Sequence, residues 1–452
     1  MLKHTILSRV YNPHFFINSR VSTTSLFVSV NNLSKQTMST AVSATVPSSS
    51  TSTTTTTSSS STTTTTLSHH AGNGRYQNPL EWNSYVDNGL LDFFTKALPE
   101  WRKVKLYPLP IKAVNWEEIN NAPSTLVNTN TSIQSLWIGH VTFLLQSIQG
   151  LNILTDPVFS DYASPVNYIG PPRYTPSPCK IDELPPIHIV LISHNHYDHV
   201  DSASIRNLVQ KEKKDLKMYN QQASHSEKIP YTGTHYYCPL GVGALLQSFG
   251  VNPDKITELD WWQERQYTVP PTNTASITTS NLATLSCVPA QHQSARTPFD
   301  RNTTLWCGWV ITFHNGSGIT KESSKVYFSG DTGYRSVAKG TLPYSEEENN
   351  AVRCPIFKQI GERYGPIDLG LLPIGAYSPR TFMSSVHASP EDAVEMHAEL
   401  VCKKSIGMHW GTFNLTDEPI EEPPQRLEEA VRRKGLEKDA FVAIKQGEIV
   451  RV

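Results

Sequence analysis

The sequence predicts an α/β fold in which β-sheets are faced by helices. The first observation is the order of the elements. From Ser135 onward, short apolar segments separated by turns give way to apolar segments that alternate with helical patterns. The second observation is that a histidine-rich segment, residues 194–199, directly follows the very apolar residues 187–192. We therefore expect a buried strand at 187–192 and a functional segment just past its end.

Composition bounds the class of protein. The chain has 452 residues, 38% of them hydrophobic, and a formal net charge of -1, so it can bury a core and gives no sign of a nucleic-acid binder. Its six cysteines are scattered without a Cys-x-x-Cys pair, which argues against a disulfide scaffold and a thiolate zinc site and favours an intracellular, reducing compartment. No run of about eighteen apolar residues occurs, so any membrane contact is expected to be peripheral.

The N-terminal region differs from the rest of the chain. Residues 1–38 form a basic leader without acidic residues, since the first acidic residue is Glu81. This balance resembles a mitochondrial presequence, and a merely disordered leader is the alternative. Residues 39–74 form a Ser/Thr-rich linker that cannot bury enough surface to fold. We expect residues 75–452 to form the folded domain, beginning near Arg75.

A first helix is predicted where the domain begins. Leu90, Phe94 and Leu98 have helical spacing, and Leu91 and Phe93 widen the apolar face. We expect this face to pack in the core, with contact to lipid as the alternative.

The remaining elements follow from periodicity. Strands are expected at residues 136–138, 142–146, 152–154, 187–192, 284–288, 305–313, 326–328, 369–372 and 441–444. Helices are expected at residues 202–211, 242–249, 355–364, 390–401 and 425–433. The helix at 390 has Ser389 as an N-cap, Pro390 at its first position, and Glu391 and Asp392 in its first turn.

The segment after the strand at 187–192 has the spacing of metal ligands. In extended backbone, residues two apart point the same way, so His194 and His196 can share one metal ion. Asp198 and His199, past the bend, then reach toward a second ion. A solvated histidine-rich turn is the alternative, but three imidazoles and a carboxylate in six positions favour two adjacent half-sites.

Three later segments offer the missing ligands. His292 follows the strand that ends at Val288, and His409 follows the apolar residues 405–408. Asp331 lies in a Gly-Asp-Thr-Gly turn, where glycines let the backbone bend so that one carboxylate could bridge two ions. Taken singly, each has an ordinary structural explanation, such as an Asx turn for Asp331.

In this order, the motifs resemble a metallo-β-lactamase-fold hydrolase. Over residues 77–452 the resemblance narrows to the N-acylphosphatidylethanolamine-hydrolysing phospholipase D family. The segments that carry it are Leu-Thr-Asp-Pro at 154–157, residues 192–199, Glu-Leu-Asp-Trp-Trp at 258–262, Gly-Asp-Thr-Gly-Tyr at 330–334, Pro-Ile-Gly-Ala-Tyr at 373–377 and His-Trp-Gly-Thr-Phe at 409–413. The histidine motif is shared across the superfamily, whereas the combination with Asp-Trp-Trp and His-Trp-Gly-Thr-Phe is more specific.

The resemblance implies a four-layer αβ/βα sandwich with two mixed sheets and two zinc ions per chain. It implies one zinc bound by His194, His196 and His292. It implies a second zinc bound by Asp198, His199 and His409, with Asp331 bridging the two. Manganese and iron remain alternatives for this donor set.

Two further residues carry roles under the resemblance. Asp156, at the end of an early strand, is expected to orient a ligand histidine. His387 matches a family position required for activity, and we expect it to contact phosphate or assist the leaving group, with a capping or packing role as the alternative.

The implied reaction is hydrolysis of an N-acylphosphatidylethanolamine to phosphatidic acid and an N-acylethanolamine. Two metals would lower the pKa of a bridging water and screen the phosphodiester charge, so hydroxide attacks phosphorus, with Asp198, Asp331 and His387 as catalytic residues. The substrate implies peripheral membrane contact, and the aromatic-rich residues 82–101 are candidates to line an apolar groove. A homodimer is left open.

This chain departs from the family sequence pattern at two places, and three other functions are alternatives to the implied one. The family usually has an aromatic residue where this chain has Gln293, and residues 219–237 look like a polar and aromatic insertion. The main alternative is a hydrolase of a smaller soluble ester or phosphodiester. A non-catalytic lipid-binding protein would have no need of the full ligand set. A nuclease would be expected to carry a basic surface, which the composition does not indicate.

Overall fold

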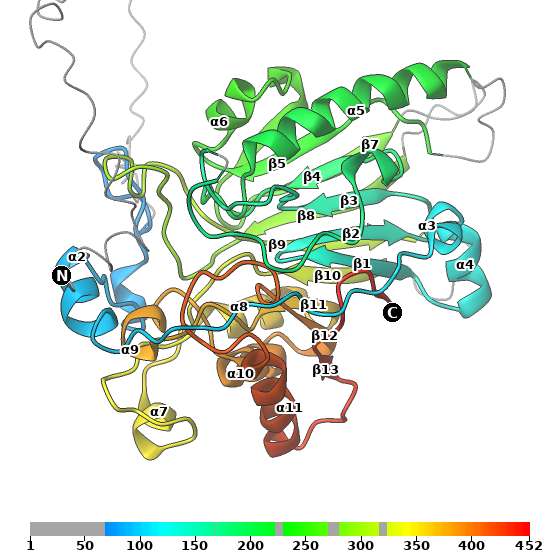
Figure 1. Cartoon of the computed structure of the whole chain (residues 1–452). Coiled ribbons are helices and arrows are strands. Elements are labelled where there is room, and N and C mark those ends of the chain that lie inside the picture. Colours follow the sequence, from blue (N-terminus) through cyan, green and yellow to red (C-terminus); the bar gives the residue numbers. More distant parts are fainter. Residues whose placement is uncertain (1–67, 167, 222–228, 270–279, 316–322) are drawn as a thin grey trace, which may run out of the picture. The chain divides into compact units, whose positions relative to one another are not determined.

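The computed structural model describes residues 68–166, 168–221, 229–269, 280–315 and 323–452, all within the unit Ser68–Val452 (Figure 1). The predicted leader and the Ser/Thr-rich tract up to residue 67 lie outside these residues. The described part begins seven residues before Arg75, where the sequence predicts the folded domain to start. Within the described residues, His69 and His70, which the sequence assigns to the linker, are hydrogen-bonded to Asp260.

Within the described residues, the strands form two seven-stranded mixed sheets, as the α/β sandwich prediction requires. The first has the order β14-β1-β2-β3-β4-β5-β6. Its strands are β1 Ile133–Gly139, β2 Thr142–Ser147, β3 Asn152–Thr155, β4 Ile189–Leu191, β5 His235–Pro239, β6 Ile256–Leu259 and β14 Ile449–Arg451. Strands β14 to β3 are antiparallel to their neighbours, whereas β3 to β6 run parallel.

The second sheet has the order β13-β12-β11-β10-β9-β8-β7. Its strands are β7 Glu264–Val269, β8 Ser280–Val288, β9 Gly308–His314, β10 Ser323–Phe328, β11 Ile367–Pro373, β12 Cys402–Met408 and β13 Phe441–Val442. Here too an antiparallel half, β7 to β10, is followed by a parallel half, β10 to β13. The two sheets therefore repeat one pattern of strand directions.

Helices cover the outer faces of the two sheets (Figure 1). Helices α5 Ser202–Gln221 and α6 Gly243–Ser248 lie over the first sheet, and α8 Ile356–Tyr364, α10 Pro390–Glu399 and α11 Glu422–Lys434 lie over the second. The shorter elements are η2 Leu80–Trp82, α2 Leu90–Asp92, η3 Phe93–Ala97, α3 Trp116–Asn120, α4 Ala122–Thr129, η4 Ile181–Glu183, η5 Pro253–Lys255, α7 Glu346–Asn350 and α9 Arg380–Met383. The order helix, sheet, sheet, helix confirms the four-layer sandwich.

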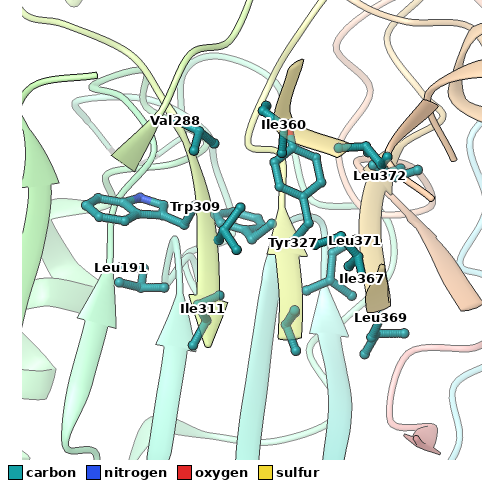
Figure 2. Packing of buried hydrophobic residues seen from close by; sticks show 14 of the residues in the cluster. Leu191, Val288, Trp309, Ile311, Tyr327, Ile360, Ile367, Leu369, Leu371 and Leu372 are labelled. Carbon is teal, nitrogen blue, oxygen red and sulfur yellow. The ribbon is translucent and has the colours of Figure 1, made fainter. Parts of the chain in front are cut away.

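The core lies between the facing sheets and under the helices. Strand β4 shows how period-two alternation divides it, since Leu191 joins the cluster between the sheets whereas Val190 joins the cluster beneath α5. Figure 2 shows Trp309 beside Leu191 of the first sheet, in the space between the sheets, whereas Tyr327 lies on the other face of its sheet beside Ile360 of α8. A strand buried on both faces reads as a continuous apolar run, which explains residues 187–192.

Each strand expected from the sequence lies within or overlaps an observed strand, but several observed strands were not expected. Strands β6 and β7 lie at sheet edges; β7 carries four exposed polar side chains, and β6 is only four residues long with Thr257 and Glu258 at its centre, so their apolar signal is weak. Residues 235–237, assigned to an insertion, instead belong to β5 between β4 and β6, and residues 222–228 of that insertion lie outside the described residues. Helix α5 continues ten residues past the expected end at 211, through a charged stretch that has no apolar stripe to signal it.

The expectation that the apolar face at residues 90–98 packs in the core is wrong for two of its members. Leu91 is 76% exposed and Phe94 is 44% exposed. The segment consists of the short α2 followed by the π-helix η3, in which the Leu98 amide donates to the Phe93 carbonyl. The wider π turn disrupts the face that α-helical spacing predicts. No helix among the described residues has the length and apolar character needed to cross a bilayer.

Candidate metal centre

The predicted ligands lie on loops that follow strands. The histidine motif begins after β4, His292 follows β8, Asp331 follows β10 and His409 follows β12. Strand β4 belongs to the first sheet and the other three strands belong to the second. The loops that follow them meet, because their ligand atoms form two groups in which all atoms lie within 4.8 Å of one another. The structure thereby brings together side chains that are up to 215 positions apart in sequence.

The first cluster contains His194, His196, His292 and Asp331. His194 Nε2 lies 2.8 Å from His196 Nδ1, and His292 Nε2 lies 3.3 Å from the same atom. Asp331 Oδ2 is 3.9 Å from His194 Nε2 and 3.7 Å from His292 Nε2. Three imidazole nitrogens and one carboxylate oxygen thus converge on a common point.

The second cluster contains Asp198, His199 and His409, as expected, together with His140. Asp198 Oδ2 lies 3.6 Å from His199 Nε2 and 3.5 Å from His409 Nε2. Asp331 adjoins this cluster as well, since Oδ2 lies 3.1 Å from His199 Nε2 and Oδ1 lies 3.0 Å from His409 Nε2. One carboxylate therefore stands between the two clusters, the position that a bridging ligand requires.

Asp156 lies behind His199. Its Oδ2 is 2.7 Å from His199 Nδ1, and its Oδ1 accepts a hydrogen bond from the Ser193 amide at 2.7 Å. The side chain is fully buried. A carboxylate on the distal nitrogen of an imidazole fixes the ring orientation and turns Nε2 toward a metal position.

His387 lies at the edge of both clusters. Its Nδ1 is 4.0 Å from Asp331 Oδ2, and its ring centroid is 5.2 Å from those of His292 and His409. Its neighbour Val386 accepts a hydrogen bond from His292 Nδ1 at 2.9 Å. The short segment before α10 therefore both orients a predicted ligand and presents His387 to the site.

His140 was not expected from the sequence. It lies in the tight turn between β1 and β2 with φ +52°, and its Nε2 is 3.0 Å from Asp198 Oδ2. Its backbone carbonyl accepts a hydrogen bond from the His409 amide. The one available signal was its place at a strand end, which His292 and His409 share; a lone histidine in a hairpin turn gave no reason to single it out.

Two side chains support the loops without reaching the metal positions. Arg296 Nη1 donates to the carbonyls of Asn195, at 2.7 Å, and Val200, at 3.0 Å, so it ties together the loop that carries the histidine motif. The Gln293 amide oxygen accepts from Arg301 Nη2 at 2.7 Å. The Gln293 side chain, which stands where the family usually has an aromatic residue, is therefore hydrogen-bonded to Arg301.

Burial keeps several of the imidazoles neutral. It lowers the pKa of His194 and His292 well below the usual value, and that of His196 less strongly. Burial also lowers the pKa of His387 to about 4 and, with help from His409, that of His140 to about 3. A neutral imidazole has a free lone pair, which is the form that binds a metal ion.

The remaining four groups carry charge. Burial would lower the pKa of His199 and His409, but Asp331 and Asp198 outweigh it, raising His199 well above its usual range and His409 to about 9. Burial would raise the pKa of both carboxyls, but His199 and further imidazoles hold them well below their usual range. Two buried carboxylates thus need positive charge, which imidazolium groups provide here and divalent cations would provide better.

The pattern of missing hydrogen bonds fits a metal centre. His199 Nε2, His409 Nε2, Asp331 Oδ1 and His387 Nδ1 are buried and make no hydrogen bond of normal geometry among the described residues, although the two imidazole nitrogens of His199 and His409 lie 3.1 and 3.0 Å from Asp331 oxygens. Buried polar atoms are rarely left in this state, and each of these atoms belongs to a residue of a possible metal-binding group. Nitrogen and carboxylate donors without thiolate suit zinc, manganese or iron.

Comparisons with known proteins agree with this geometry. A family model described as a β-lactamase superfamily domain matches residues 151–410, which include each of the seven predicted ligands. N-acyl-phosphatidylethanolamine-hydrolyzing phospholipase D 1 of Caenorhabditis elegans is 30% identical over 392 residues, covering 83% of this chain and 92% of the relative.

Two further relatives match smaller shares. An uncharacterised protein of Mycobacterium tuberculosis is 38% identical over 294 residues, covering 64% of this chain and 62% of the relative. The mitochondrial N-acyl-phosphatidylethanolamine-hydrolyzing phospholipase D of Saccharomyces cerevisiae is 29% identical over 323 residues, covering 71% of this chain and 56% of the relative.

Proposed function

Because the chain belongs to the N-acyl-phosphatidylethanolamine-hydrolysing phospholipase D family of the β-lactamase superfamily, we propose that it hydrolyses N-acylated phosphatidylethanolamine. The bond cut is the phosphodiester to the ethanolamine, and the products are phosphatidic acid and an N-acylethanolamine. The observation that carries the proposal is the 30% identity, over 83% of this chain, with a relative whose name states this substrate.

Two divalent ions, with zinc as our first choice, are the proposed cofactors. His194, His196 and His292 would hold one ion, and Asp198, His199 and His409 the other, with Asp331 between them. Bound there, the ions lower the pKa of a water molecule toward neutrality and screen the phosphodiester charge. The neutral His194 and His292 and the ionised Asp331 and Asp198 have the protonation states that such binding needs. At His199 and His409, whose pKa values are raised, a bound ion would take the place of the proton.

The residues around the ligands hold them in place. Asp156 fixes the ring of His199 through a 2.7 Å contact, and His140 lies 3.0 Å from Asp198 Oδ2. A bridging carboxylate and its neighbours must keep their geometry as charge develops on the phosphoryl oxygens, because a preorganised site needs no reorganisation during the reaction.

We propose that His387 contacts the phosphate. Burial lowers its pKa to about 4, so near neutral pH the imidazole is uncharged and is a weak candidate for protonating the leaving alkoxide. A neutral imidazole donates one hydrogen bond, and a phosphoryl oxygen is a strong acceptor. This argument favours the phosphate-contact role over the leaving-group role.

The proposed reaction involves no covalent intermediate with the protein. Oxygen from water bonds to phosphorus, the bond from phosphorus to the ethanolamine oxygen breaks, and that oxygen takes a proton. Hydrolysis in ¹⁸O-labelled water should therefore place the label on phosphatidic acid. Label in the N-acylethanolamine would rule out attack at phosphorus.

We further propose that the segment around residues 80–94 contacts the membrane that holds the substrate. Leu80, Val86, Leu91 and Phe94 are exposed by 81%, 45%, 76% and 44%. Neighbouring residues tie the segment to the site: the Asn78 amide donates to the His292 carbonyl at 2.8 Å. An exposed apolar group joined to the active-site loops suits a protein that takes its substrate from a bilayer.

The compartment is also a proposal. The leader is basic and lacks acidic residues, and the Saccharomyces cerevisiae relative is named as mitochondrial, which together support a mitochondrial address. A fluorescent protein fused to residues 1–80 should then accumulate in mitochondria. Diffuse fluorescence would remove this option.

The deciding experiment is product analysis by mass spectrometry. The full chain, loaded with zinc, is incubated with vesicles containing an N-acylphosphatidylethanolamine, beside a His194→Ala, His196→Ala control. We expect N-acylethanolamine and phosphatidic acid in equal amounts from the intact protein and neither from the control. Free fatty acid or lysolipid would mean that a different bond is cut. Activity on dissolved esters with none on vesicles would favour a small-substrate hydrolase.

A further inference from the structure

A third group of metal-binding side chains lies where the described domain begins. His69 Nε2 is 2.7 Å from Asp260 Oδ1, and His70 Nε2 is 2.8 Å from Asp260 Oδ2. The three side chains share no residue with the two clusters of the candidate centre. They join positions 191 apart in sequence and come from a segment and a turn that the proposed reaction does not use.

We propose that His69, His70 and Asp260 bind a third divalent ion, of the zinc class, with a structural role. Two imidazole nitrogens and one carboxylate oxygen are borderline donors that suit such an ion. Both members of the His-His pair contact the same carboxylate, one through each of its oxygens.

The geometry lies close to what an ion needs. Two ligand atoms on a tetrahedral zinc ion lie about 3.3 Å apart when each bond is about 2.0–2.1 Å long, so each imidazole nitrogen must move by only about 0.5 Å from its carboxylate oxygen. The ligand atoms of the three residues already lie within 4.8 Å of one another. In the candidate catalytic centre, His194 Nε2 and His196 Nδ1 show the same 2.8 Å approach.

The site can be reached from solvent on one side. The side chains of His69 and Asp260 are only 6% and 9% exposed, whereas that of His70 is 34% exposed. An ion can enter on the side of His70 and keep a water molecule as its fourth ligand, while the other two donors remain fixed in the protein. His69 is held in place by stacking on Trp261 at 4.2 Å, and Asp260 accepts from the Trp261 amide at 2.8 Å.

The position explains what a structural ion would do. Residues 68–84 contain one three-residue 3₁₀ helix and one isolated bridge, so tertiary contacts must order this segment. The same segment reaches the catalytic centre, where Asn78 pairs with the backbone of His292 through both its amide nitrogen and its amide oxygen. An ion at His69, His70 and Asp260 cross-links the start of the segment to the Asp-Trp-Trp turn and so supports the loop of a predicted catalytic ligand.

The test separates metal binding from hydrogen bonding. A His69→Gln, His70→Gln variant keeps amide donors that can bond to Asp260 but removes the imidazole ligands. The full chain and the variant are saturated with zinc, passed through gel filtration, and measured by inductively coupled plasma mass spectrometry. We expect the variant to bind one zinc fewer per chain, and its melting temperature to lose part of the rise that zinc gives the full chain.

Controls keep the result interpretable. His314→Gln removes a histidine that hydrogen-bonds Thr284 outside the three groups, and it should leave zinc content unchanged. The His194→Ala, His196→Ala protein should still lose one zinc when the two glutamine substitutions are added, so the outcome does not depend on the proposed function. Asp260→Asn should give the same loss and serves if the double variant fails to fold. Equal zinc content in the full chain and in these variants would overturn the third site and leave a hydrogen-bonded clamp.

Discussion

His140 Nε2 lies 3.0 Å from Asp198 Oδ2, so a histidine from the first hairpin contacts a carboxylate of the metal-binding motif across 58 positions of sequence. Burial and neighbouring imidazoles keep His140 neutral, with a pKa of about 3. If the His140 ring orients Asp198, its loss weakens the second metal position while the first keeps its ligands.

We therefore predict that His140→Ala lowers zinc affinity at one of two catalytic positions by about 10–100-fold, the effect typical of groups that orient metal ligands. Competition with a chromophoric chelator measures the two affinities separately. His397→Asn, which changes a buried histidine stacked on Phe441, is the matched control and should bind zinc normally. Equal affinities in His140→Ala and wild type would show that Asp198 holds its position unaided.

Asp331 adjoins both clusters, and its replacement should damage both. Asp331→Asn keeps the size of the side chain but removes the negative charge shared between the two positions. We predict a fall in kcat/KM of about 10³-fold, on the order of 4 kcal/mol, with reduced zinc content. Full zinc content with unchanged activity would contradict a bridging role for Asp331.

Asp156 acts through His199. In Asp156→Asn, an amide replaces the carboxylate that lies 2.7 Å from His199 Nδ1, so the ring loses its fixed orientation and part of its basicity. We predict about 10–100-fold weaker zinc binding at the position of His199 and a smaller loss at the other position. A circular dichroism spectrum matching the wild type would confirm that the fold persists, and an equal loss at both positions would indicate general disruption instead.

The ion pairs of Asp392 with Arg335 and Arg380 should determine how the stability of the protein changes at acid pH. Asp392 is fully buried and receives hydrogen bonds from Arg335 Nε at 2.7 Å and Arg380 Nη1 at 2.8 Å. Burial alone would raise the pKa of Asp392, but Arg380 and Arg335 outweigh it and hold it below its usual range. Asp392 also caps α10, because it accepts from the Ser389 amide.

Asp392→Asn should therefore lower the free energy of unfolding by about 3–5 kcal/mol at pH 7, since the buried Arg335 and the partly buried Arg380 lose their charged partner. A carboxyl whose pKa is lowered by folding stabilises the protein above its unfolded pKa of about 3.9 and stops doing so as the pH falls through the folded value. The difference between variant and wild type should shrink below about pH 4. Urea unfolding at several pH values measures this difference in the free energy of unfolding. A difference that does not change with pH would contradict an ionised Asp392 paired with the two arginines.

Membrane contact should depend on the exposed apolar residues of α2 and η3. Replacing Leu91 and Phe94 with glutamate should weaken binding to vesicles by at least about 100-fold, since each side chain contributes roughly 1.5–3 kcal/mol when buried in lipid. Hydrolysis of a dissolved analogue should be unchanged. Val127→Glu is the control, because Val127 is 63% exposed on α4, away from α2 in Figure 1. Vesicle co-sedimentation that is unaffected by the two substitutions would place the membrane contact elsewhere.

Much of the fold could be predicted from local patterns. Strand β4 is a continuous apolar run, β11 is largely apolar although Asp368 lies within it, and the helix α10 has the N-cap and first-turn residues that the sequence predicts. Patterns failed where local sequence carries little signal. Most residues of strand β7 are polar and exposed, so the strand lacks an apolar pattern. The apolar spacing of Leu91 and Phe94 gave no indication of a π-helical turn.

The sequence by itself determined the layered α/β class and the four metal-binding candidates of residues 194–199, because apolar periodicity and the short spacing of the histidine motif are local properties. The choice of His292, Asp331 and His409 as further candidates rested on the family resemblance. Only the tertiary structure decided that His140 reaches Asp198, that His69 and His70 reach Asp260, and that Leu91 and Phe94 face outward. These relationships depend on which strands pair and on how loops distant in sequence meet at one end of the sandwich. No local pattern encodes such contacts, since they are fixed by the burial of the whole core.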